Sequence, residues 1–175
     1  MRVGVEQERT AKPVSDTRPT IWNHLETEYT APIRDPLWGH IYLSPAMLRI
    51  VNTTDFQQLG RIKQLGPTFL VYPGATHTRL NHSLGVFHLA RRIVTRIVHH
   101  AEAPPLTLDG VKAFLAAALL HDVGHFPYTH SFKTLPLAEH EHLTGRIVRG
   151  GTLRERIKED LRVDPAMVAA IVDET

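Results

Sequence analysis

The chain has 175 residues, of which 42% are hydrophobic and 22% charged, a composition that excludes a disordered or low-complexity protein and fits one globular domain. Its formal net charge is only +2, so the charge balance gives no indication of nucleic-acid binding. No cysteine is present, which excludes a disulfide framework and thiolate chemistry. The N-terminal residues contain no signal-peptide pattern, and no stretch approaches the ~18 apolar residues of a membrane span. We therefore expect a cytoplasmic protein without membrane contact.

The N-terminal third is expected to hold a tail, a short extended region and two short helices. Residues 1–20 are polar and punctuated by prolines, which predicts a flexible tail ahead of a domain over 21–175. Residues 31–43 alternate around a turn-forming Asp-Pro pair and predict a short extended piece or a small β-hairpin. Ser44 followed by Pro45 predicts a helix start, and Asp55 is a candidate cap for the next helix.

A long helix is expected to begin near Asn81, after a loop rich in turn-forming residues. Its apolar residues recur at helical spacing and are expected to face the core: Val86, Leu89, Ala90, Ile93 and Ile97. His82 lies four residues before Val86 and shares that inward face, which is an unusual place for a polar side chain.

The second half of the chain reads as further helices. Thr107 is expected to cap a helix that contains the apolar run 113–120. A helix from His140 is expected to end at the glycine pair 150–151, and Thr152 to cap the next one. Asp164 and the following proline predict the start of a last helix. The expected fold class is all-α.

The segment 121–130, His-Asp-Val-Gly-His-Phe-Pro-Tyr-Thr-His, places three histidines and a carboxylate directly after the apolar run. Burying that run brings Asp122 to the edge of the core, where desolvating a carboxylate costs several kcal/mol unless a partner neutralises it. A divalent metal is such a partner, and imidazole and carboxylate ligands suit Zn, Fe, Mn or Ni.

Several motifs in one order resemble the HD-domain metal-dependent phosphohydrolases. The segment 79–86, Arg-Leu-Asn-His-Ser-Leu-Gly-Val, precedes the His121-Asp122 pair and then His125 and His130. Segments 35–36, 56–57, 62–66 and 72–75 resemble the branch of deoxynucleoside triphosphate triphosphohydrolases that carry SAM and HD domains. The resemblance implies an HD-domain helical bundle that hydrolyses a dNTP to a deoxynucleoside and triphosphate.

The resemblance also implies a site for one divalent ion, Fe, Mn, Zn, Ni or Mg. His82, His121 and Asp122 match three of the ligands of the family. The fourth is an aspartate in a downstream helix, and the sequence ends before such a motif, so we expect a chain truncated before its last metal-ligand helix. Asp164 and Asp173 remain, but neither lies in a matching motif.

Further residues match catalytic and substrate-binding positions of the family. The resemblance implies that His130 is a general acid or base, with His125 and His140 beside the phosphate; alternatively, these two hold other side chains by hydrogen bonds. Gln64 and Arg79 match positions that contact the sugar and a phosphate. Lys133 stands where many relatives carry a carboxylate that orients the catalytic histidine.

Two other functions stay open on the sequence alone. One is a different nucleotide phosphohydrolase, acting on a monophosphate, an alarmone or a cyclic nucleotide. The other is a truncated, catalytically weak module that binds nucleotide or a partner.

The family also implies a homo-oligomer. Arg91, Arg92 and Arg96 read as a solvated helix face, and nucleic-acid binding by them is the less favoured alternative.

Overall fold

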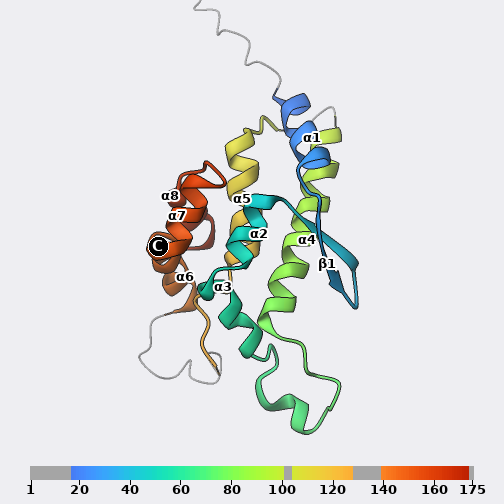
Figure 1. Ribbon diagram of the computed structural model, residues 1–175, viewed down its shortest axis with the longest axis vertical. Helices are drawn as coiled ribbons and strands as arrows, with labels where there is room; N and C mark the ends of the chain where they lie inside the picture. The colour runs from blue at the N-terminus through green and yellow to red at the C-terminus, as the bar shows by residue number, and fades with distance from the viewer. Residues whose placement is uncertain (1–16, 101–103, 128–138, 174–175) are drawn as a thin grey trace, which may run out of the picture.

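A computed structural model describes residues 17–100, 104–127 and 139–173, and this part of the chain is mainly α-helical, as the sequence predicts (Figure 1). The α-helices are α1 (Arg18–Thr27), α2 (Pro45–Val51), α3 (Thr54–Gln57), α4 (Arg79–His99), α5 (Leu108–Leu120), α6 (His140–Val148), α7 (Gly151–Glu159) and α8 (Pro165–Val172). Two 3₁₀ helices, η1 (Gln58–Arg61) and η2 (Gly66–Leu70), and one hairpin of β1 (Ala31–Asp35) and β2 (Gly39–Leu43) complete the described elements.

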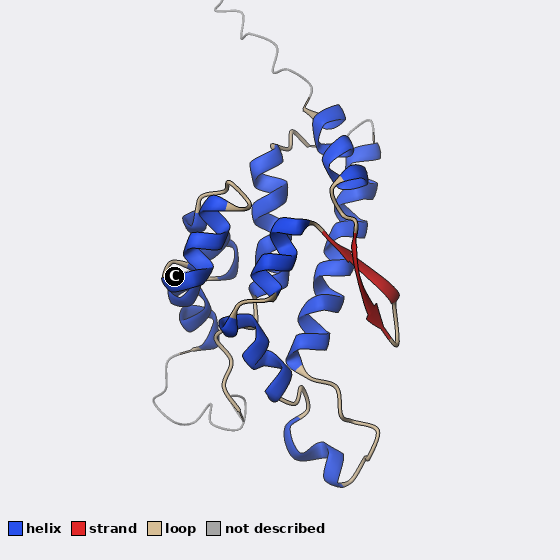
Figure 2. Ribbon diagram, viewed as in Figure 1, coloured by secondary structure: helices blue, strands red, loops and turns tan. Residues whose placement is uncertain are grey.

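The core forms around α4 and α5, which pack against each other along their length (Figure 2). Val111, Leu115 and Leu119 of α5 are buried at helical spacing. The other side of α5 contacts α8, which in turn contacts α6, while α1 packs against α4. Of the candidate ligands, His82 lies on α4, and His121 and Asp122 follow directly after α5.

The region 31–43 is a two-stranded antiparallel hairpin, which confirms the hairpin interpretation of that segment. Its register runs from Ala31 opposite Leu43 to Asp35 opposite Gly39. The carboxylate of Asp35 accepts hydrogen bonds from two backbone amides in the turn, and Gly39 adopts the positive φ that closes it. The turn residue Trp38 lies against Gly85, so the hairpin lies beside the first turns of α4.

Three predicted helix caps are confirmed: Ser44, Thr107 and Asp164 each accept a hydrogen bond from a backbone amide in the first turn. Two predicted caps are wrong. Thr53, not Asp55, caps α3, since its extended backbone aims its hydroxyl at the amide of Phe56. Gly150, not Thr152, precedes α7, because the helix already begins at Gly151.

The predicted inward face of α4 is wrong in part. Leu89, Ile93 and Ile97 are 42%, 53% and 36% exposed. Instead, the buried apolar residues of the middle and end of the helix are Phe87, Ala90, Val94 and Val98. The helix carries two apolar stripes, and the second lines an open groove with Phe114 and Ile171. Among the described residues nothing covers this groove, and no described helix is long and apolar enough to cross a membrane.

Candidate metal centre

His82 is held in the first turns of α4 by a strong local helix signal. The hydroxyl of Thr78 accepts from the amide of Asn81, and the side chain of Asn81 accepts from the amide of Thr78, so the two residues form a reciprocal cap. The helix therefore begins at Arg79, two residues before the predicted start. Arg79 and His82 are three residues apart and project from the same face.

His121 occupies the C-cap position of α5, so the buried apolar run of that helix fixes its place. Its Nδ1 atom lies 3.0 Å from the carbonyl oxygen of Ala118 and is the donor in that contact. The lone pair on its Nε2 atom is therefore free for a ligand. Fixing one ring nitrogen through a backbone carbonyl is a common way to orient a metal-binding histidine.

The rings of His82 and His121 meet at their Nε2 atoms, which lie 3.3 Å apart. Two nitrogen ligands that each lie about 2.1 Å from one ion are about 3.0 to 3.4 Å apart at octahedral or tetrahedral angles. Since the Nε2 lone pair of His121 faces the other ring, the contact needs either a proton on His82 or a cation between the rings. The spacing fits a shared metal ion.

Asp122 supplies the oxygen ligand of this group. Its carboxylate is buried, and its ligand atom lies within 4.8 Å of those of His82 and His121. One carboxylate oxygen accepts from Nη1 of Arg79 at 2.9 Å, and the other lies 3.4 Å from Nε2 of His121. The donor set is two imidazoles and one carboxylate, which suits a divalent ion of borderline or hard character.

The electrostatics of the group favour the protonation states that bind a metal. Burial lowers the pKa of His82, although the charge of Asp122 partly opposes this. Burial alone would raise the pKa of Asp122, but the positive charges that His121 and His125 carry when protonated, with the charge and hydrogen bond of Arg79, outweigh it and hold that pKa below its ordinary value. A neutral imidazole and an ionised carboxylate result, and these are the forms that act as ligands.

His125 and His140 form a second layer beside Asp122. The ring of His125 is buried, and its Nδ1 lies 3.2 Å from the carboxylate of Asp122. The His140 ring stands edge-on to it, with ring centroids 3.8 Å apart. Asp122, His125 and His140 have ligand atoms within 4.8 Å of one another, so Asp122 belongs to two His-carboxylate groups. His140 also pairs with Glu141.

Gly124 and Thr144 join the His-Asp turn to α6. A Cβ on Gly124 would lie 2.3 Å from the carbonyl oxygen of His140, so only glycine allows the helix to approach this closely. The buried hydroxyl of Thr144 donates to the carbonyl oxygen of His121 and accepts from the amide of Gly124. These two contacts fix His140 relative to His121 and Asp122.

The other predicted site residues lie in different places. Gln64 sits beside the start of α4, where its backbone N–H donates to the backbone carbonyl oxygen of His77. The buried Oε1 of its side chain has no hydrogen-bond partner in the described part of the chain. His130 and Lys133 lie outside the described residues.

Asp164 caps α8. Asp173 is buried 3.5 Å from Arg149, and neither aspartate belongs to the His82 group within the ranges described.

Sequence reasoning missed the roles of Arg79 and Thr144 in holding the site together. The ion pair of Arg79 with Asp122 spans 43 positions, and the bridge from Thr144 to His121 spans 23. Arg79 lies three residues before His82 on the same helix face, and this spacing was the available signal for the role of Arg79. No local pattern marks Thr144.

A His-Asp pair that could hold a metal ion, beside a histidine from a second helix, indicates a class of protein, and comparison with known proteins identifies it. The family model described as HD domain matches residues 79–174, more than half of the chain. The chain belongs to the HD-domain family.

Among its relatives, the chain is 42% identical over 111 residues to human deoxynucleoside triphosphate triphosphohydrolase SAMHD1, covering 62% of this chain and 18% of that protein. It is 40% identical over 121 residues to the uncharacterized protein YwfO of Bacillus subtilis, covering 68% of this chain and 27% of YwfO. The crystal structure of a phosphohydrolase from Bacteroides thetaiotaomicron superposes with a TM-score of 0.67 at 31% identity, covering 81% of this chain and 34% of that one. The chain thus spans about a third or less of the length of each.

Proposed function

We propose that this chain forms the catalytic core of a metal-dependent nucleotide phosphohydrolase, with a deoxynucleoside triphosphate as substrate and a deoxynucleoside and triphosphate as products. The observation that carries the proposal is the 3.3 Å approach of the His82 and His121 Nε2 atoms beside the buried carboxylate of Asp122. The naming of human SAMHD1 as a deoxynucleoside triphosphate triphosphohydrolase supports the substrate.

His82, His121 and Asp122 would hold one divalent ion, with Fe, Mn, Zn, Ni and Mg as candidates. Such an ion, when bound, polarises a phosphoryl oxygen and lowers the pKa of a water molecule. Arg79 holds the carboxylate of Asp122 in place by its hydrogen bond from Nη1. The HD resemblance also implies a further aspartate ligand, and we propose that a segment outside the described residues supplies it.

The remaining histidines are proposed to handle the phosphate. His125 and His140 stand together beside Asp122, and the ligand atoms of all three lie within 4.8 Å of one another. We assign them to hold phosphate oxygens, with His130 as the general acid or base that transfers a proton to or from the scissile oxygen.

Gln64 and Arg79 are proposed to contact the substrate directly. The buried Oε1 atom of Gln64, which has no hydrogen-bond partner among the described residues, can accept from a sugar hydroxyl. Nε of Arg79 is likewise buried without a partner there, so the guanidinium retains donors for a phosphate after binding Asp122.

A binding module without turnover is the second candidate, and a specific observation favours it. In the described chain, the group of His82, His121 and Asp122 offers three ligands, of which one is a carboxylate. Such a site retains a metal less well than a site with two carboxylates. In that case the protein would bind nucleotide or assemble with other copies of itself, and hydrolysis would require a carboxylate from elsewhere. Hydrolysis of another nucleotide class, such as a cyclic nucleotide or an alarmone, is the remaining enzymatic alternative.

The test combines metal content with turnover. Purified protein is analysed for bound metal by mass spectrometry and then assayed with each of the four dNTPs, beside His82→Ala and Asp122→Asn. His100→Ala, an exposed histidine at the end of α4, is the control. We expect near-stoichiometric metal and triphosphate release in the wild type and in the control, with both lost in the two site variants. Metal at background in all four proteins would refute the assignment of the ligands.

A further inference from the structure

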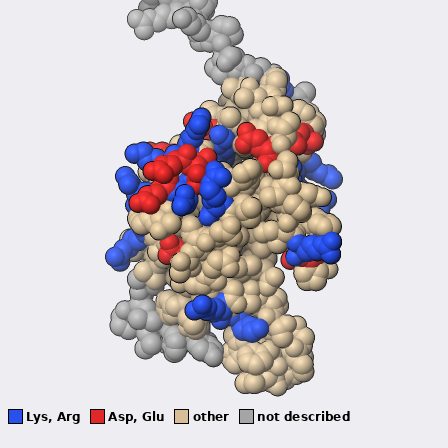
Figure 3. All heavy atoms as spheres, in the orientation of Figure 1, with Lys and Arg blue, Asp and Glu red and all other residues tan. Residues whose placement is uncertain are grey.

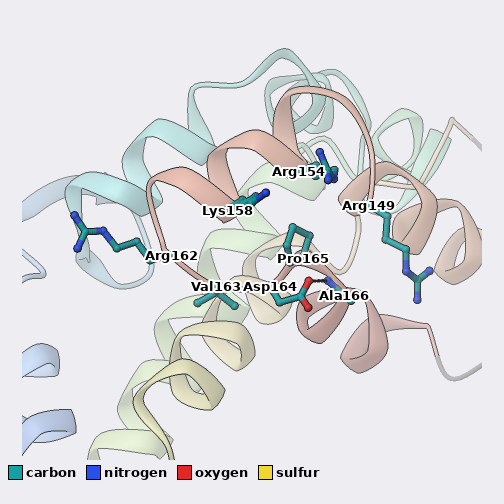
Figure 4. A pocket seen from close by; sticks show the side chains of 8 residues that line it. All are labelled: Arg149, Arg154, Lys158, Arg162, Val163, Asp164, Pro165 and Ala166. Carbon is teal, nitrogen blue, oxygen red and sulfur yellow. Dashed lines mark hydrogen bonds between the residues drawn. The ribbon is translucent and has the colours of Figure 1, made fainter.

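A cavity lies away from the His-Asp group, between the end of α6, the length of α7 and the start of α8 (Figure 4). Its volume is about 620 Å³, which lies within the range of roughly 300 to 1,000 Å³ common for small-molecule sites. Arg149 borders it at the C-cap of α6, whereas His140 begins that helix, so the two sites are roughly 13 Å apart along the helix axis. The cavity is therefore separate from the candidate metal centre.

The charge around this cavity is strongly one-sided. Arg149, Arg154, Lys158 and Arg162 border it, against a single acid, Asp164. Asp164 already accepts a hydrogen bond from the amide of Ala166, drawn as a dashed line in Figure 4, so its carboxylate is engaged in capping α8. Arg149 lies 3.5 Å from the carboxylate of Asp173, so the local excess is about two positive charges, in a chain whose formal net charge is +2.

Two of the cations on α7 are not neutralised by neighbouring acids. Arg154 and Lys158 are four residues apart on one helix face, and in the described part of the chain neither side chain makes an ion pair. Asp160, by contrast, pairs with Arg49 and Arg156 on another side of the helix. Figure 3 shows that acids and bases intermingle over the face of α7 in that view. These two unpaired cations, Arg154 and Lys158, border the cavity.

The cavity also has an apolar part. Val163, Pro165 and Ala166 line it between the cations, and Val163 and Pro165 are buried. In Figure 4, the side chains of Arg154 and Lys158 lie on one side of Pro165 and Arg149 on another, while Arg162 extends away from them. A ligand with adjacent anionic groups can contact Arg154 and Lys158 on their side of the cavity.

We propose that this cavity binds a polyphosphate anion of about triphosphate length, either free or as the tail of a nucleotide. Arg154 and Lys158, four residues apart on α7, can contact adjacent phosphate groups, and charge-assisted hydrogen bonds from arginine to phosphate are among the stronger polar contacts in proteins. A hollow of this volume suits a compact ligand better than a nucleic-acid strand, which binds along an extended basic groove. The amides of α8 contribute little, since Pro165 has none and that of Ala166 is occupied.

Binding of inorganic tripolyphosphate and of dATP, measured by isothermal titration calorimetry, tests the proposal. The protein is first stripped of metal with a chelator and dialysed, so that the His-Asp group cannot hold polyphosphate through an ion. The test variant is R154Q/K158Q. The matched control is R92Q/R96Q, which removes two exposed cations at the same i, i+4 spacing from α4. Thermal melting confirms that both variants fold.

We expect saturable one-to-one binding of tripolyphosphate that R154Q/K158Q weakens at least tenfold and R92Q/R96Q changes less than twofold. Tighter binding of dATP than of tripolyphosphate would identify a nucleotide as the ligand, and equal or weaker binding a free polyphosphate. Loss of affinity to the same extent in both variants would overturn the proposal, since it would reflect overall charge. No saturable binding, or binding of a single-stranded oligonucleotide alone, would overturn it as well. The outcome is independent of the proposed hydrolysis, because the experiment contains no metal and leaves His82 and Asp122 intact.

Discussion

Nη1 of Arg79 donates to a carboxylate oxygen of Asp122 at 2.9 Å, and each of these side chains is only 6% exposed. Arg79 begins α4 and Asp122 follows α5, so the pair joins the same two helices that bring His82 and His121 together. Such a buried pair stabilises the fold chiefly by preventing the cost of an uncompensated charge. It also fixes the direction of the carboxylate toward the two histidines.

Replacing Arg79 with Met should destabilise the metal-free protein by about 3–5 kcal/mol, since it leaves the carboxylate of Asp122 buried without its main partner. Urea unfolding of chelator-treated protein measures this loss. The double variant R79M/D122N should recover a large part of it, because both charges are then absent. A loss below about 1 kcal/mol in R79M, with no recovery in the double variant, would mean that water or neighbouring groups already solvate the carboxylate.

The helical fold and the identity of the candidate ligands follow from local features of the sequence. Ser44, Thr107 and Asp164 mark helix starts because each side chain satisfies an amide within three residues, which is a local interaction. His82 and His121 could be singled out by their motif spacing. These predictions required no knowledge of which helix packs on which.

What the sequence could not predict depends on tertiary packing. α4 carries two apolar stripes, and periodicity alone does not say which one is buried; the stripe with Phe87 is buried, whereas Ile93 is 53% exposed and lines an open groove with Phe114 of α5. Thr53 competes with Asp55 for the same cap, and backbone conformation decides between them. The bridge by Thr144 depends on the approach of α6, which no local pattern encodes.

Gly124→Ala should displace the start of α6 and weaken metal retention. The new methyl group would lie 2.3 Å from the carbonyl oxygen of His140 and 2.5 Å from the amide nitrogen of Thr144, and both are backbone atoms that cannot move aside independently. Overpacking of this kind costs about 1–3 kcal/mol. Gly74→Ala is the control, because a Cβ there meets nothing within 4 Å.

Urea unfolding and metal titration of these two glycine variants measure the effect. We expect a lower unfolding free energy and weaker metal binding for Gly124→Ala, with values near wild type for Gly74→Ala. Equal behaviour of the two variants would show that α6 can shift without affecting the His-Asp turn, and that the close contact at Gly124 does not hold the site.

Metal removal should lower the melting temperature of the wild type. A ligand present at 100 times its dissociation constant stabilises the folded state by about 2.7 kcal/mol, which for a domain of this size corresponds to roughly 5–10 °C. Differential scanning calorimetry with Mn²⁺ and then with excess chelator measures the shift. His82→Ala should show almost no shift, whereas His100→Ala should keep it. The same shift in both variants would place the stabilising ion elsewhere on the protein.

The stability of the metal-free protein should also fall as the pH drops below about 6.5, in part because of His24, which is remote from the candidate ligands. Burial is the main cause that lowers the pKa of this histidine; its pair with Glu28 opposes the shift, and the charges of Arg91 from α4 and Lys112 from α5 add to it. The folded state therefore binds a proton at His24 less readily than the unfolded state. The stability that neutral, buried His24 contributes to the folded state is fully present above the ordinary histidine pKa of 6.5, and it is lost as the pH falls below that value.

His24→Leu removes this titration while keeping an apolar group of similar size against α4 and α5. The pH dependence of its unfolding free energy between pH 7 and pH 5 should be flatter than that of the wild type, by at most about 1.4 kcal/mol per pH unit for one proton. His100→Leu, at an exposed position, should leave the slope unchanged. Because His82 titrates in the same direction, some slope should survive in His24→Leu. A slope identical to that of the wild type would mean that His24 is protonated equally in the folded and unfolded states, and that its pair with Glu28 outweighs its burial.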